Sequence, residues 1–170
     1  MKYSKIRIIC TAAILAAISC VIAYCCKILT FGSIRITLEN LPIILCGYLF
    51  GPVFGFACGA ASDLLNSCVF YGIGGINPII TFGAGCVGLF SGLFSRLLKG
   101  RSNNIRLVAS ISSAHIVGNM IVKSIGLHIY YSYPYKVLLL RIPLYLAIGT
   151  IEYFLLKILL KNSKIGGGLK

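Results

Sequence analysis

Residues 35–63 read RITLENLPIILCGYLFGPVFGFACGAASD, and this stretch decides the fold. It opens with a cation, Arg35, and a carboxylate, Glu39, at the edge of an almost wholly apolar run. Glycines then recur every fourth residue, at positions 47, 51, 55 and 59. This spacing strips the side chains from one stripe of a helix, so that a second backbone can approach closely. Because Pro52 interrupts the pattern, we expect two short membrane helices joined by a tight Phe50-Gly51-Pro52 turn.

The composition identifies the solvent as a bilayer. Hydrophobic residues make up 58% of the 170 positions and charged residues only 11%, with a mean hydropathy of +0.95. Such a chain cannot cover a water-facing surface, so we predict a single integral membrane domain over residues 1–170. The net charge of +13 collects mostly at the ends of apolar runs, as the positive-inside rule requires, and we therefore expect no nucleic-acid partner.

The apolar runs predict an all-α bundle of six transmembrane helices. The first is long enough to span a hydrocarbon core of about 30 Å, and the absence of a small-residue cleavage site argues against a signal peptide. The second has about half the necessary length, so it is tilted, extended by irregular residues, or re-entrant. The expected helices are about Ile6–Leu29, Leu41–Phe50, Val53–Phe70, Pro78–Leu98, Ile105–Leu127 and Val137–Leu160.

The cations orient the bundle. Three clusters fall on one side if the chain crosses six times, which predicts that this side and both termini are cytoplasmic in a plasma membrane. The clusters are Lys2, Lys5 and Arg7; Arg96, Lys99, Arg101 and Arg106; and Lys157, Lys161, Lys164 and Lys170.

Five further cations map to the outer loops or the outward third of a helix. The position of Lys27 and Lys136 at helix ends favours side chains that extend to the interface. A charge inside the bilayer is costly, so Arg35, Lys123 and Arg141 are expected to line a polar cavity.

A polar stripe runs along the fifth predicted helix, where His115, Asn119 and Lys123 are spaced four apart. His115 is expected to bond a neighbouring helix more often than a ligand. Asp63 and Glu152 each lie inside an apolar helix. They are either the coupling site of a proton- or sodium-driven carrier or structural pins paired with Asn66, Lys157 or backbone.

An outer loop with three glycines, Gly72, Gly74 and Gly75, precedes the fourth helix and is a candidate gate. Asn77 is placed to cap that helix, with Pro78 at its first position. The loop is neither a GxGxxG nor a Gly-Lys-Ser/Thr phosphate motif. The eight cysteines and two histidines show no metal-ligand spacing, and no catalytic motif is present, so we expect no metal, no cofactor and no enzyme activity.

Five segments carry a family resemblance. Arg35-Ile-Thr-Leu-Glu-Asn-Leu-Pro42, Phe50-Gly-Pro-Val-Phe-Gly55, Asp63-Leu-Leu and Ile76-Asn-Pro-Ile-Ile-Thr81 look like the folate family of substrate-binding S components of energy-coupling factor (ECF) transporters. Leu139-Leu-Arg-Ile-Pro143 resembles that family's arginine-bearing sixth segment. The loop departs from the Phe-Pro-Gly-Phe-Thr of related folate binders. The resemblance implies six helices that capture a vitamin outside and pass it to a shared ATP-driven module.

The same resemblance assigns a docking surface to the first helix. Ala12, Ala13, Ala16 and Ala17 form two overlapping small-xxx-small pairs, which permit close helix packing. S components are similar in using such a stripe to dock on a transmembrane coupling subunit, although packing inside the chain would need the same residues. With no Walker A loop in the chain, the resemblance implies that two separate ATPase subunits hydrolyse ATP.

The expected function is therefore a vitamin-binding S component, with folate or a related pteridine as the first choice of substrate. Arginine suits its anionic glutamate tail because the guanidinium pairs with a carboxylate in a bidentate manner. The alternatives are a small proton-coupled carrier that uses Asp63 or Glu152, or an assembly subunit without a ligand. The expected substrate-binding residues are Arg35, Glu39, Asn40, Tyr71, Asn77, Pro78, Thr81, Asn119, Lys123 and Arg141.

Overall fold

A computed structural model describes residues 5–28, 38–72, 75–132 and 135–162. Within this part of the chain the regular structure is helical. The elements are α1 (Lys5–Ile28), α2 (Asn40–Phe50), α3 (Pro52–Tyr71), α4 (Pro78–Leu97), α5 (Asn103–Ser113), η2 (Ala114–Val122), α6 (Lys123–Tyr131) and α7 (Tyr135–Asn162).

The helices follow the apolar runs of the sequence. Segments α5, η2 and α6 continue one another, so that the described residues form six helical runs, five of them long and apolar enough to cross a membrane. The exception is α2, whose 11 residues rise only about 16 Å at 1.5 Å per residue. The prediction of an all-α membrane protein with a short second helix is confirmed.

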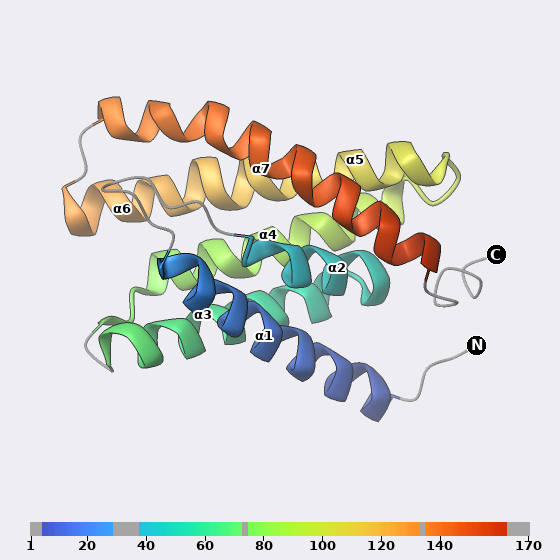
Figure 1. Cartoon of the computed structure of the whole chain (residues 1–170), viewed down its shortest axis with the longest axis horizontal. Coiled ribbons are helices and arrows are strands. Elements are labelled where there is room, and N and C mark those ends of the chain that lie inside the picture. The colour runs from blue at the N-terminus through green and yellow to red at the C-terminus, as the bar shows by residue number, and fades with distance from the viewer. Residues whose placement is uncertain (1–4, 29–37, 73–74, 133–134, 163–170) are drawn as a thin grey trace.

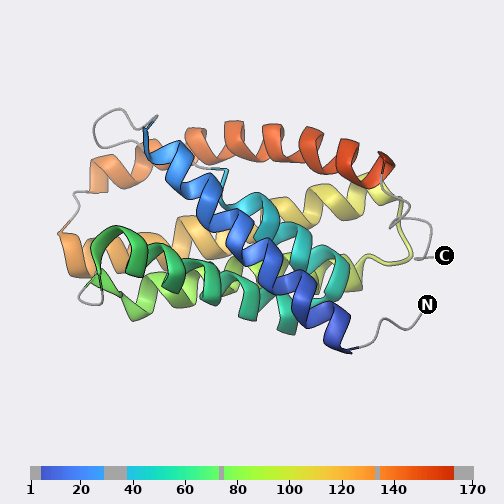
Figure 2. The same cartoon turned by 60° about the horizontal axis from the view of Figure 1, so that its bottom comes forward.

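The central helix is α4, which contacts α2, α3, α5, η2 and α6 (Figure 1). On one side α1 crosses the pair formed by α2 and α3, as Figure 2 shows. On the other side α7 runs along α5 and η2. The first turn of α1 and the last turn of α7 lie at the same end of the bundle, which we call the terminal end (Figure 1). The chain therefore returns to the end where it began.

The glycine stripe forms the closest helix contact of the bundle. A β-carbon at Gly47 or Gly55 would overlap the backbone carbonyl of Gly88, and one at Gly59 would overlap that of Ala84. Small residues on α4 thus face small residues on α2 and α3, and the backbones touch. Gly51 has φ +99° and ends α2 by donating its N–H to the Gly47 carbonyl at 2.9 Å, which confirms the predicted turn.

Serine hydroxyls tie α2 to α4 alongside this contact. Ser91 donates to the Ile44 carbonyl and Ser95 to the Tyr48 carbonyl, both at 2.9 Å. These bonds satisfy hydroxyl groups that are wholly buried among apolar residues. The two helices are held in one register by contacts that a lipid-facing helix could not make.

Arg106 belongs to a predicted cytoplasmic charge cluster, and the structure shows that its side chain is buried. Its Nε and Nη2 donate to Ser95 Oγ at 3.0 and 2.7 Å, and the guanidinium lies 4.4 Å from the centre of the Tyr48 ring. The sequence placed Arg106 beside Arg101 because both follow the end of α4, but the first turn of α5 directs it inward.

Candidate functional site

An ion pair joins the start of α2 to the start of α6. Lys123 Nζ lies 3.8 Å from Glu39 Oε1, and the two side chains are largely withdrawn from solvent. Glu39 is anchored in turn because Ser19 of α1 donates to its backbone carbonyl at 2.6 Å. Next to it Asn40 is buried, and its Oδ1 has no hydrogen-bond partner within the described residues. Three segments of the chain therefore converge on one polar cluster.

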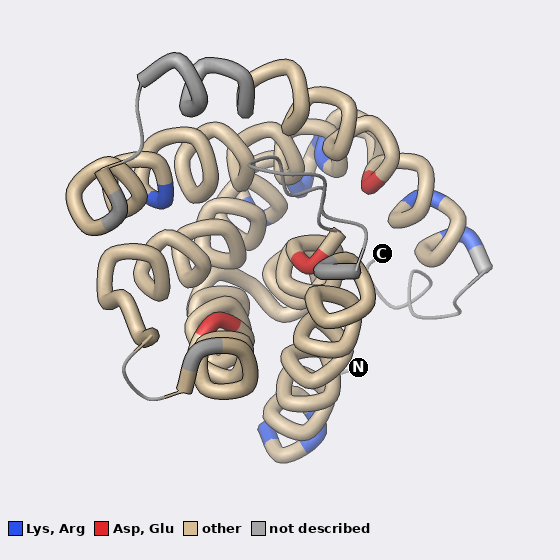
Figure 3. Tube along the Cα trace, turned by 60° about the vertical axis from the view of Figure 1, so that its left-hand side comes forward, with Lys and Arg blue, Asp and Glu red and all other residues tan. Residues whose placement is uncertain are grey.

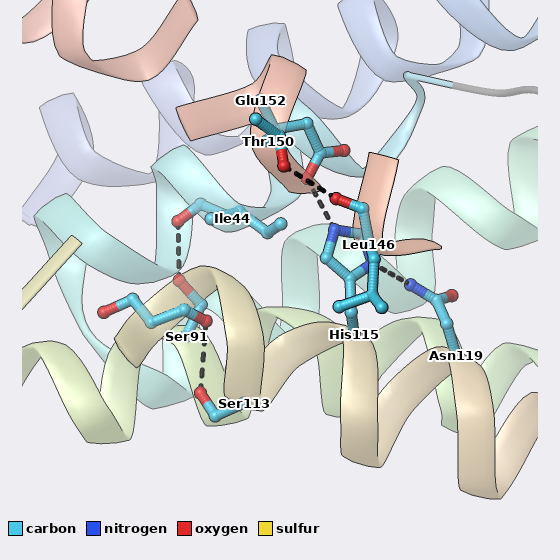
Figure 4. A network of polar contacts seen from close by, with 9 residues as sticks. Ile44, Ser91, Ser113, His115, Asn119, Leu146, Thr150 and Glu152 are labelled. Atoms are coloured by element: carbon cyan, nitrogen blue, oxygen red, sulfur yellow. Dashed lines mark hydrogen bonds and ion pairs between the residues drawn. The ribbon is translucent and has the colours of Figure 1, made fainter. Parts of the chain in front are cut away.

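A second polar contact connects α7 to η2 (Figure 4). His115 Nε2 lies 2.6 Å from Glu152 Oε2, and Asn119 Nδ2 lies 3.0 Å from His115 Nδ1. All three residues are buried, and the His115 ring also packs against Tyr145 of α7 at 5.4 Å between ring centres. His115 and Asn119 lie on η2, which is wound as a π-helix, a geometry that is common at functional sites.

The structure corrects the expected partners of the two intramembrane carboxylates. Glu152 bonds His115, whereas Lys157 contacts Tyr153 at 3.4 Å. Asp63 accepts a hydrogen bond from the Thr81 hydroxyl at 2.7 Å and thereby ties α3 to α4. These pairings between helices favour the structural alternative over a coupling site for protons.

Thr81 and Pro78 lie apart from the Glu39–Lys123 cluster. They line an open apolar groove of about 330 Å³ between α3 and α4, whose lining contains none of Glu39, Asn119 and Lys123. Thr81 is already engaged by Asp63. The sequence grouped these residues in one site, but the structure divides them between two faces of α4.

The loop before α4 begins and ends as the sequence indicates. Asn77 Oδ1 accepts from the backbone N–H groups of Ile79 and Ile80, at 3.1 and 3.4 Å, and Pro78 follows at the first helical position. Gly72 has φ +69° with open space around it, and the N–H of Gly75 donates to its carbonyl at 3.1 Å. Gly74 and Arg35 lie outside the described residues, as do the side chains of Tyr71 and Arg141.

The comparison with known families decides the identity. A model described as the ECF-type riboflavin transporter S component matches residues 3–162, nearly the whole chain. The chain belongs to this family. No curated protein matches it. As an S component it is the substrate-binding membrane subunit of an ECF vitamin transporter and resides in the plasma membrane, as the apolar helices require.

The family confirms the ECF part of the expected resemblance and names riboflavin where the sequence motifs suggested folate. An S component is not an enzyme, in agreement with the missing catalytic motifs. Among the described residues no group of three or more metal-ligating side chains comes together. Riboflavin and folate are therefore the two candidate vitamins.

The alanine stripe of the S component is divided between two surfaces. Ala16 is buried against Cys46 and Cys58, and Ala12 packs on the same cluster while its carbonyl accepts from the Cys58 thiol at 3.5 Å. Ala13 and Ala17 are exposed on the opposite side of α1. Half of the stripe thus packs inside the chain, and the other half lies on the surface of α1.

The acidic residues of the S component come from three separate parts of the chain. Figure 3 shows them at separate positions, and each lies on a different segment: Glu39 before α2, Asp63 in α3 and Glu152 in α7. Sequence reasoning singled out Glu39, Asn119 and Lys123, and the structure joins Glu39 to Lys123 and Asn119 to His115. It missed the pairing of His115 with Glu152.

Proposed function

We propose that this S component captures riboflavin at the outer face of the membrane and delivers it to a coupling subunit and two ATPase subunits. The family description supports riboflavin. The positive-inside rule supports a cytoplasmic terminal end, because the connection between α4 and α5 carries Lys99 and Arg101 there. The start of α2, with Glu39, then lies toward the outside, where a scavenged vitamin arrives.

The observation that carries the choice of substrate is the Glu39–Lys123 pair. Folate carries two carboxylates, whereas riboflavin is uncharged and presents ring carbonyls, a ring N–H and ribityl hydroxyls. Lys123 already has a carboxylate at 3.8 Å, so the described part of the cluster is balanced in charge. A balanced cluster with amide groups favours a neutral ligand rich in hydrogen bonds over a dianion.

Buried polar atoms without partners give the cluster its binding capacity. Asn40 Oδ1 and Asn119 Oδ1 are both buried and unpaired within the described residues. An unmade hydrogen bond of this kind costs about 1–3 kcal/mol, which a ligand donor would recover. Ring N–H and ribityl O–H groups of riboflavin are donors of the right type.

The test is calorimetric titration of the purified protein with riboflavin and, separately, with folate. We expect riboflavin to bind and folate to bind at least about tenfold more weakly, since a carboxylate left without a cation is costly to desolvate. Lys123→Met should weaken riboflavin binding by roughly three- to thirtyfold, because it removes a donor and leaves Glu39 uncompensated.

Lys157→Met is the matched control, because Lys157 is an exposed cation on α7 that, within the described residues, contacts Tyr153 of the same helix. It should bind riboflavin like the wild type. Tighter binding of folate than of riboflavin would overturn the choice of vitamin. Unchanged riboflavin affinity in Lys123→Met would remove the Glu39–Lys123 pair from the site.

A further inference from the structure

Two unpaired oxygens mark the buried contact between α7 and η2. Glu152 and Asn119 are fully buried and His115 is 3% exposed, yet Asn119 Oδ1 and Glu152 Oε1 meet no hydrogen-bond partner within the described part of the chain. A contact that served only to fasten α7 would be expected to satisfy its own polar atoms. Here an oxygen at each end of the contact is left without a partner, and the one on Asn119 lies on the helical run that carries Lys123.

The Asn119 amide determines where the His115 proton lies. A neutral imidazole has one N–H and one lone pair. Asn119 Nδ2 lies 3.0 Å from Nδ1, and an amide nitrogen only donates, so Nδ1 holds the lone pair. The neutral ring then carries its proton on Nε2, 2.6 Å from Glu152 Oε2. Since an amide carries its oxygen on the opposite branch, Asn119 Oδ1 is turned away from His115, as Figure 4 shows.

Asn119 precedes Lys123 by four residues on the same helical run, so Asn119 Oδ1 and the Lys123 ammonium belong to neighbouring turns. An acceptor at Asn119 and a donor at Lys123 are the complement of a ring in which an N–H adjoins a carbonyl. The reverse amide orientation would present two donors and would lose the match to the N–H. The position of the proton on His115, beside Glu152, therefore decides whether Asn119 offers an acceptor to a ring N–H.

We propose that His115 and Glu152 are positioning residues that hold the Asn119 carboxamide with its oxygen toward the substrate. The site then selects a heterocycle that presents a ring N–H. This inference rests on the proposed vitamin-binding function and assigns to the pair a part in specificity. His115 and Glu152 act only through Asn119 and do not themselves touch the ligand.

The binding test compares riboflavin with riboflavin methylated at its imide nitrogen, which lacks that N–H. The wild type should prefer riboflavin by at least about tenfold, because the methylated compound leaves Asn119 Oδ1 unpaired. Glu152→Gln should keep this ratio, since a glutamine oxygen can still accept from Nε2. Glu152→Leu should reduce the ratio several-fold, because the His115 proton can move to Nδ1 and the amide can turn.

The methyl group of methylated riboflavin adds the same bulk for Glu152→Gln and for Glu152→Leu. A difference in ratio between the two variants therefore does not come from that bulk. Ser113→Ala is the matched control, because Ser113 is a buried hydroxyl two residues before His115 whose bonds within the described residues go to the Ser110 and Phe90 carbonyls. It should lower stability without changing the ratio. Equal weakening of both ligands in Glu152→Leu would overturn the proposal and leave a structural pin.

A ligand-free measurement separates this inference from the proposed function. The chain has only two histidines, so ¹⁵N spectra of the protein and of His128→Gln assign the His115 ring. We expect the Nε2–H tautomer in the wild type and a growing Nδ1–H population in Glu152→Leu. An Nδ1–H ring or an imidazolium in the wild type would overturn the amide orientation. Absence of riboflavin binding would instead refute the proposed function alone.

Discussion

At the scale of single residues, each acidic side chain of the bundle has its own partner. Glu39 pairs with Lys123, Asp63 with Thr81 and Glu152 with His115, and each contact joins two helices. Arg106 has no carboxylate among these, and its guanidinium is held by one hydroxyl and one aromatic ring. In an apolar setting such contacts must replace the hydration that each group has lost.

Arg106→Lys should lower the thermal stability of the purified protein. The ammonium keeps the charge but loses the planar fork that bonds Ser95 twice and the stacking on Tyr48. We expect a loss of about 1–2 kcal/mol, the combined value of a cation–π contact and a charge-assisted bond after partial replacement. Melting curves in detergent measure it.

Arg101→Lys is the control for this change, since Arg101 is exposed on the same connection. It should melt like the wild type. If Arg106→Lys also melted like the wild type, the buried guanidinium would contribute no more than a surface cation, and its contacts would carry little energy.

At the scale of elements, the close contact of α2 and α3 with α4 determines the architecture. The periodic glycines at 47, 55 and 59 meet Gly88 and Ala84, so that three helices approach at backbone distance. This core leaves α7 attached mainly through α5 and η2, where the His115–Glu152 contact lies. Leu156 of α7 is also buried in one apolar cluster with Ile43 and Ile44 of α2.

Gly88→Ala should be strongly destabilising, because its β-carbon would meet the Gly55 backbone, including Cα at 2.9 Å. Backbone cannot rotate aside as a side chain can, so α3 and α4 must separate. We expect a loss of at least about 1–3 kcal/mol, the usual cost of overpacking. Thermal unfolding followed by circular dichroism would measure it.

The control is Gly100→Ala, at a glycine with no atom within 4 Å of the added β-carbon. Its melting temperature should stay at the wild-type value or rise slightly, since alanine restricts the unfolded chain. A Gly88→Ala variant as stable as Gly100→Ala would mean that the glycine contact is looser than the structure shows.

The helices and their packing could be predicted from the sequence wherever a pattern repeats. Helices came from long apolar runs, the close contact from the fourfold glycine spacing, and the cap from Asn77-Pro78. Single polar residues were harder, because the pairing of His115 with Glu152 depends on the relative depth of two helices. One residue shifts that depth by about 1.5 Å, and no local pattern encodes it. The π-helical winding of η2 likewise corresponds to no repeating residue pattern.

At the scale of the whole molecule, the proposed binding cluster and the proposed docking stripe involve different residues. The Glu39–Lys123 pair joins the start of α2 to the start of α6, whereas Ala13 and Ala17 are exposed on α1, which crosses the outside of α2 and α3 (Figure 2). Large apolar side chains flank the stripe, among them Ile9 and Ile14. This separation allows substrate capture and partner docking to be tested independently.

Ala13→Trp should abolish ATP-dependent vitamin uptake by the assembled transporter while the isolated S component still binds riboflavin. Ala13 is exposed, so the indole occupies the space that a partner helix needs for close approach. Ala16→Trp should behave differently. Ala16 is only 3% exposed against Cys46 and Cys58, and the added bulk must push α1 away from α2 and α3.

Uptake of labelled riboflavin by cells that carry the coupling and ATPase subunits, set beside calorimetry on the purified chain, separates the two effects. For Ala13→Trp we expect wild-type binding, an unchanged melting temperature and no uptake. For Ala16→Trp we expect a lower melting temperature and loss of both activities, because a displaced α1 also withdraws Ser19 from the Glu39 carbonyl. Normal uptake with Ala13→Trp would show that the coupling subunit docks elsewhere. The alanines at 12, 13, 16 and 17 would then serve only the packing of α1 on its own bundle.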